Sequence, residues 1–100
     1  MQNVVGIRNL RRRVSESIVT VARGETVVVV RHGRPIAIIR PVVPGDTGRR
    51  ISVTTFRDNL RRALAVTRRR PLLLTWYGDS AAIVEAPPPG LVIEEEEDWA

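Results

Sequence analysis

Two stretches of this chain have aligned apolar patterns, as if one small unit were present twice. Residues 5–41 and residues 51–87 each run in the order short β segment, amphipathic helix, turn, apolar strand, glycine turn, apolar strand. The offset between them is 46 residues through the helix and 45 after the first turn, so that Gly33 aligns with Gly78. Few aligned residues are identical, so the evidence for a repeat is the matched spacing of apolar residues. The repeat predicts two similar units related by an approximate two-fold axis.

The size of the repeat constrains how the two units are arranged. The chain has 100 residues, which suffice for one compact domain but not for two ordinary ones. A single unit of roughly 40 residues buries too little surface to be stable alone. We therefore expect the units to share one core.

The chain has no cysteine, which excludes disulfides and thiolate metal sites. No stretch has the layout of a signal peptide or a membrane span, so we expect a cytoplasmic protein with no membrane partner.

Local patterns predict the elements of each unit. Residues 26–31 form a β-branched run without polar alternation, which indicates a strand buried on both faces. His32 and Gly33 predict a tight hairpin turn. A break near Arg13 divides the helix of the first unit. Thr54 or Thr55 is the expected N-cap of the helix in the second unit. Apolar residues spaced by four, four and three predict one buried helical stripe in each unit: Leu10, Val14, Ile18 and Val21, and then Phe56, Leu60, Leu64 and Thr67.

Charge is distributed unevenly along the chain. All 16 basic residues other than His32 are arginines, and residues 1–93 hold them against six acids, a balance of +10. Five consecutive acids, residues 94–98, reduce the total to +5. A basic body with an acidic tail indicates a polyanionic partner for the body and a separate role for the tail. A genome rich in G and C would also favour arginine over lysine.

The residues of the first unit resemble the N-terminal domain of Phd/YefM antitoxins. The resemblance rests mainly on Gly24-Glu25 and on the hairpin string R-H-G-R-P-I-A that begins at Arg31. The second unit has the helix opening T-T-F-R-D-N-L and a less similar hairpin. The resemblance covers both units, about three quarters of the chain. It implies a βααββ unit that dimerises through its sheet and binds operator DNA. Many family members also carry a C-terminal extension that wraps and inhibits a toxin.

The fold implied by this resemblance is α+β. Two Phd/YefM-like units would form an intrachain pseudo-dimer with a shared, mostly antiparallel sheet of six strands and with helices packed on it. We expect the first repeat at residues 1–41, a linker at 42–50, the second repeat at 51–87, and a Pro-rich exit with an acidic tail at 88–100. The fused chain would be a monomeric pseudo-dimer or a homodimer. The alternative fold is a swapped-hairpin barrel of the AbrB/MazE kind, which does not usually place an amphipathic helix before both hairpins.

Arginines are the candidate DNA contacts, because the guanidinium group binds phosphate and reads guanine. The resemblance places one contact at the helix opening, where the chain has Arg11 in the first unit and Arg57 in the second. It places another at the end of the first hairpin strand, where the chain has Arg31 in the first unit and Trp76 in the second. The first unit should therefore hold DNA more tightly, on an imperfectly palindromic duplex site. The alternative is solvated surface charge. The complete predicted set is Arg11, Arg12, Arg13, Arg31, Arg57, Arg61 and Arg62, with Arg68–Arg70 as further phosphate contacts.

The acidic tail has three open interpretations. It could be inert and solubilising, it could fold back on the arginine face, or it could bind a cognate toxin such as a ribonuclease. The candidate toxin-binding residues are Leu91, Ile93, Glu94, Glu95 and Trp99.

No residue pattern supports catalysis or a cofactor. His32, the single histidine, has no partner in the sequence that suggests a metal site, and no serine has a neighbouring base. Trp76 and Tyr77 either close an edge of the core, which we favour, or stack on a base. We therefore expect a non-enzymatic, antitoxin-like DNA-binding repressor that regulates its own toxin–antitoxin system. The alternative is a protein-binding inhibitor that acts through its acidic tail and binds little specific DNA.

Overall fold

The computed structural model describes residues 3–93. Within this range the chain forms six strands and four helices: β1 (Asn3–Gly6), α1 (Ile7–Arg12), α2 (Val14–Ala22), β2 (Val27–Arg31), β3 (Arg34–Arg40), β4 (Arg49–Ser52), α3 (Val53–Asp58), α4 (Leu60–Val66), β5 (Leu72–Trp76) and β6 (Asp79–Glu85). All six strands form one sheet in the order β1-β2-β3-β6-β5-β4. The predicted α+β class with a six-stranded sheet is confirmed. Three of the five strand pairs are antiparallel, and the two outer pairs are parallel.

The two halves of the sheet have the same element order and the same register. β1 pairs with β2 in parallel from Asn3 and Val27 onward, and β4 pairs with β5 in parallel from Arg49 and Leu72 onward. These positions are related by the offsets of 46 and 45 residues. The hairpins β2–β3 and β5–β6 each contain one register shift, at aligned positions. β3 and β6 run antiparallel at the centre of the sheet, where they join the halves.

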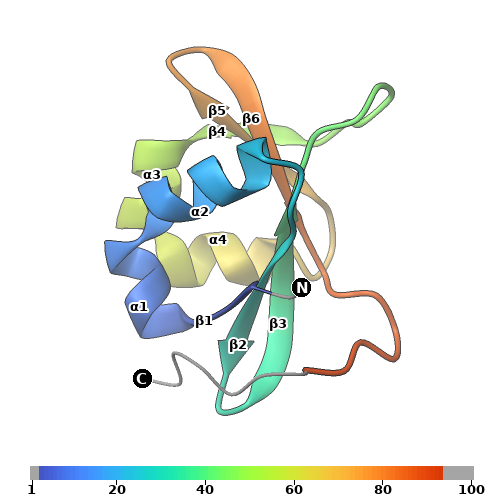
Figure 1. The fold of residues 1–100 in the computed structure, drawn as a ribbon. Coiled ribbons are helices and arrows are strands. Elements are labelled where there is room, and N and C mark those ends of the chain that lie inside the picture. Colours follow the sequence, from blue (N-terminus) through green and yellow to red (C-terminus); the bar gives the residue numbers. More distant parts are fainter. Residues whose placement is uncertain (1–2, 94–100) are drawn as a thin grey trace.

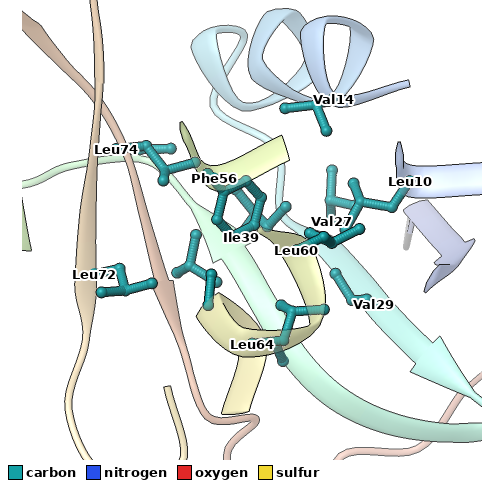
Figure 2. Close-up of a cluster of buried hydrophobic side chains, with 14 of the residues drawn as sticks. Leu10, Val14, Val27, Val29, Ile39, Phe56, Leu60, Leu64, Leu72 and Leu74 are labelled. Atoms are coloured by element: carbon teal, nitrogen blue, oxygen red, sulfur yellow. The ribbon is translucent and has the colours of Figure 1, made fainter. Parts of the chain in front are cut away.

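Both halves contribute to one hydrophobic core, as expected. The helices lie on one side of the sheet (Figure 1). Leu10 and Phe56, the first residues of the two helical stripes, are each fully buried. Figure 2 shows Phe56 among Ile39, Leu60 and Leu74, so that residues of both halves meet around its ring. Because this core is shared, neither half can bury its apolar face without the other.

The helical segments are broken and capped at aligned positions. Arg13 separates α1 from α2 with φ −121° and ψ 24°, and Asn59 separates α3 from α4 with φ −125° and ψ 38°. The break near Arg13 is thus confirmed. The N-cap predicted for the helix of the second unit, Thr54 or Thr55, was wrong. The N-cap of α3 is Ser52, whose hydroxyl oxygen accepts a 3.1 Å hydrogen bond from the Thr55 N–H. Thr55 itself lies within the first turn of α3, where its backbone N–H needs such an acceptor.

Both hairpins turn through two residues with positive φ. The φ angles are 51° at His32 and 77° at Gly33, and 51° at Tyr77 and 85° at Gly78. Two consecutive positive φ values are characteristic of the type I′ turn, which matches the twist of the flanking strands. The tight turn predicted for the first hairpin is confirmed, and the second hairpin has the same geometry although its sequence is less similar.

Two different contacts hold the segments that leave the central strands. After β3, the Arg40 guanidinium forms an ion pair with Asp46 at 2.9 Å and another with Glu85 of β6 at 2.7 Å. After β6, Leu91 and Ile93 pack against the face of the sheet that carries no helices, on a patch made of Val4, Val28, Val30 and Ile38. None of the helices within residues 3–93 is long and apolar enough to cross a membrane.

Candidate nucleic-acid interface

Four arginines line a groove between α1, the end of β2 and α4. The groove has a volume of about 560 Å³ and an adjoining hollow of about 80 Å³. All of its arginines are exposed to solvent. We define the basic groove as the polar residues that line these two spaces: Arg8, Arg11, Arg31, His32, Arg61 and Arg68.

The basic groove carries a high density of positive charge. Among the described residues, no carboxylate lines either of its two spaces. Guanidinium groups stay charged at all physiological pH values. Five such groups around one concave surface attract polyanions and orient planar donors toward phosphate oxygens.

The basic groove is built from both halves of the chain. α1 and the end of β2 provide Arg8, Arg11 and Arg31, whereas Arg61 and Arg68 follow in and after α4 of the second half. The helix layer brings α4 over the first hairpin, because the two halves pack their helices on the same face of the sheet (Figure 1). The groove therefore exists only when both halves are folded together.

A second groove of about 320 Å³ lies at the aligned position of the other half. We call it the aromatic groove. With one addition, Ser52, its lining residues align one by one with those of the 560 Å³ groove through the offsets of 46 and 45: Ile7 with Val53, Arg8 with Thr54, Arg11 with Arg57, Val30 with Thr75, Arg31 with Trp76, His32 with Tyr77, and Arg61 with Ser15.

The chemistry of the aromatic groove differs from that of the basic groove. Its single arginine, Arg57, lies 3.4 Å from the carboxylate of Asp58. Trp76 packs against the main core, whereas Tyr77 is 94% exposed. The centroids of the two rings are 6.0 Å apart, and the ring planes are inclined by 43°. The interpretation of these aromatic residues as core thus fits Trp76 but not Tyr77, because the turn directs Tyr77 into solvent.

The predicted arginines are distributed over several places. Arg11, Arg31 and Arg61 meet in the basic groove, and Arg57 lies in the aromatic groove. Arg12 donates a hydrogen bond to the side-chain oxygen of Asn9 in its own helix.

The other two predicted arginines lie beside the outer strands of the sheet. Arg13 lines a hollow of about 220 Å³ next to β1, together with Glu16. Arg62 lines a hollow of about 470 Å³ next to β4, together with Arg49 and Arg50. Neither arginine lines one of the two aligned grooves.

One arginine of the basic groove, Arg8, was not among the predicted contacts. It precedes Arg11 by three residues, which places both side chains on one helical face, and this spacing could have identified it.

The C-terminal candidates are only partly described. Leu91 and Ile93 are half-buried against the outer patch of the sheet, as given above. Glu94, Glu95 and Trp99 lie outside the described residues.

Comparison with known proteins finds similarity to an antitoxin over part of the chain. No protein-family model matches the chain, and no solved structure matches it either. Antitoxin VapB46 of Mycobacterium tuberculosis, in strains CDC 1551 / Oshkosh and ATCC 25618 / H37Rv, is 44% identical to the chain over 41 residues. The match covers 41% of this chain, and the chain spans only 40% of the length of these relatives. Over this segment the chain is similar to an antitoxin.

Proposed function

We propose that this protein is an antitoxin-like DNA-binding repressor whose single chain acts as a pseudo-dimer. The observation that carries the proposal is the basic groove, in which five arginines from both halves converge with no carboxylate among the described lining residues. The similarity of one segment to an antitoxin is consistent with a non-enzymatic regulatory role. The repressor would bind its own operator.

The repeated geometry supports the pseudo-dimer. The two grooves occupy aligned positions on the two halves, and each includes residues at the turn of one hairpin. The two hairpin turns lie at opposite ends of the sheet (Figure 1). The described molecule measures 33 Å in its longest dimension. Both grooves therefore lie within the length of about one helical turn of duplex DNA, 34–36 Å, so that one short operator would reach both.

The contact between the central strands also supports a fused dimer. Arg40 of β3 and Glu85 of β6 are aligned residues, and their side chains form an ion pair across the junction. In a symmetric homodimer these two positions would carry the same residue, and two like charges would repel each other. Complementary charges at aligned positions are available only when the two units differ, as they do within one chain.

The test is binding of the purified chain to duplexes selected from a random pool at physiological salt. We expect an enriched, imperfectly palindromic site. Arg11→Ala/Arg61→Ala removes two positive charges from the basic groove and should abolish enrichment. Arg23→Ala/Arg49→Ala is the matched control, since it removes two exposed arginines, one from each half, that line neither groove and are not among the predicted contacts. Equal losses in both variants, or binding without sequence preference, would contradict the proposal.

Neutralisation of a toxin by the C-terminal segment is a second candidate function. Leu91 and Ile93 pack on the outer patch of the sheet, and the acidic run 94–98 follows them directly in the sequence, so this patch is a surface that a partner would share. Coexpression with the product of the neighbouring gene tests it. The full chain should protect the cells and copurify with that protein, and a chain ending at Gly90 should do neither. Protection by the shortened chain would contradict a role for the tail.

A further inference from the structure

We infer that the aromatic groove is a second DNA-contact surface that acts through hydroxyl groups and Tyr77 rather than through positive charge. As a result, the chain would bind its operator in one orientation only. This inference rests on the proposed function and specifies the kind of contact that each half makes.

The position of the aromatic groove supports this role. Seven of its lining residues align one by one with residues that line the basic groove. If duplex DNA lies along the helix-bearing face and contacts the basic groove, the aligned groove faces the same duplex at the other half-site. The occupant of the aromatic groove is thereby specified by its relation to the basic groove.

The lining residues have the chemistry of DNA contacts that carry no net charge. Ser15, Thr54 and Thr75 supply hydroxyl groups around the groove, whereas the Ser52 hydroxyl is already bonded to Thr55 as the cap of α3. Such groups donate hydrogen bonds to phosphate oxygens in protein–DNA complexes. Arg57 is the only cationic side chain among the described lining residues, and Asp58 lies beside it. Electrostatic attraction in this groove is therefore weak compared with the five arginines of the basic groove.

Tyr77 is placed to contact a base or a sugar. Its side chain is 94% exposed at the tip of a hairpin, and Trp76, which is anchored in the core, lies beside it. Aromatic rings make apolar contacts with the thymine methyl group and can wedge against a base step. A ring held at a rigid turn loses little conformational entropy when it binds.

The backbone at Tyr77 gives an independent reason to expect a functional role. Its φ of 51° lies in the left-handed region, which asparagine and glycine adopt at much lower cost than a bulky residue. Folding alone would favour asparagine at this position. A large exposed ring kept in a strained conformation points to function.

The orientation test uses the absence of cysteine from the chain. Arg34 and Asp79 are aligned residues at the start of β3 and β6, each directly after its hairpin turn. Arg34→Cys and Asp79→Cys each allow an iron–EDTA cleavage reagent to be attached at one site. On the selected operator, each conjugate should cut at one end only, and the two should cut at opposite ends. Equal cutting at both ends by either conjugate would overturn the inference.

Tyr77→Asn tests the aromatic contact without disturbing the fold, since asparagine is favoured in this turn. We expect affinity for the operator to fall roughly 5- to 150-fold, the effect of losing one base–aromatic contact, while the slope of log affinity against log salt stays unchanged. Arg31→Ala, in the aligned basic groove, should lower that slope by about 0.9, the value for one phosphate contact. If Tyr77→Asn binds the operator with unchanged affinity, the inference is overturned, even if the variant no longer binds some other partner.

An exchange variant distinguishes failure of this inference from failure of the proposed function. Trp76→Arg/Tyr77→His gives the aromatic groove, at its two hairpin positions, the residues that stand at the aligned positions of the basic groove. It should increase affinity for a palindrome built from the half-site that the basic groove contacts, and cutting of the native operator should become less one-sided. If Arg11→Ala/Arg61→Ala reduces binding but the Tyr77 and exchange variants behave like wild type, only this inference fails. If none of the variants changes binding, the proposed function fails as well.

Discussion

The two halves of this molecule have similar backbone geometry and differ in the side chains that line their grooves. Their strand registers, helix breaks and turn angles agree at aligned positions. One groove is lined by arginine, whereas the aligned groove is lined by hydroxyl and aromatic residues. Backbone geometry depends on the apolar stripe and the turn glycines, which both halves keep. Exposed positions contribute little to folding, so their chemistry can differ without changing the fold.

The segments that leave the two halves show the same contrast. Asp46 and Leu91 are aligned by the 45-residue offset. Asp46 is held by the Arg40 guanidinium and by the Val43 N–H, whereas Leu91 is held by an apolar patch. The first segment continues into β4 and the second continues toward the acidic tail. The two contacts should therefore respond differently to pH and to salt.

The largest expected effect tests whether the halves are independent. Phe56→Ala should lower the free energy of unfolding by about 3–5 kcal/mol and Leu10→Ala by about 2–5 kcal/mol, because each removes a fully buried side chain from the shared core. Urea denaturation followed by circular dichroism measures both. Hydrogen exchange should show loss of protection in both halves for either variant. Loss confined to the half that carries the substitution would show that the core is not cooperative.

The aligned arginines Arg11 and Arg57 provide the next comparison. Arg11→Ala removes one charge from an uncompensated cluster, and we expect operator binding to weaken by about 1.5–3 kcal/mol, the usual worth of a hydrogen bond to a charged group. Arg57→Ala should cost less than half as much, since Asp58 already lies 3.4 Å from that guanidinium. Titrations of fluorescent operator at several salt concentrations give both values. Equal costs would show that the two grooves bind DNA alike.

The two hairpin turns should respond equally to substitution. Gly33→Ala and Gly78→Ala each place a Cβ in the left-handed region, at φ 77° and 85°, which should cost about 1–2 kcal/mol of stability. A Cβ at Gly78 would have no neighbour within 4 Å, so strain in the backbone is the whole effect there. Thermal unfolding of the two variants measures it. A difference well above this range between the variants would indicate that one turn has further contacts.

The smallest expected effect concerns the segment after β3. The hydrogen bonds from Arg40 and from the Val43 N–H lower the pKa of Asp46 to about 2. A carboxylate with a lowered pKa stabilises the fold above its unfolded value near 4, and this contribution is lost as pH falls through 2. Stability of the wild type should therefore fall more steeply between pH 4 and pH 2 than that of Asp46→Asn. Urea midpoints across this range test the difference, and Leu91→Ala, which removes no charge, should follow the wild-type slope.

Much of the local structure was predictable because short-range physics decides it. The stripe that begins at Leu10 predicted a buried helical face, and His32-Gly33 predicted a turn with positive φ. The N-cap of α3 was missed because several adjacent hydroxyl residues can cap a helix, and only the backbone path selects Ser52. Tyr77 was assigned to the core because aromatic residues are usually buried, whereas the turn directs it outward.

The sequence by itself determined the repeat, the strands and helices of each unit, the turn residues and the basic balance of the body. These follow from apolar spacing and from the conformational preferences of glycine, which act over a few residues. Only the tertiary structure decided that Arg61 of one half completes the groove of Arg11 in the other, and that Leu91 lies on the outer patch. Such contacts join residues about 50 or more positions apart in the chain. They depend on how one helix layer and one sheet pack to exclude water, which no local pattern specifies.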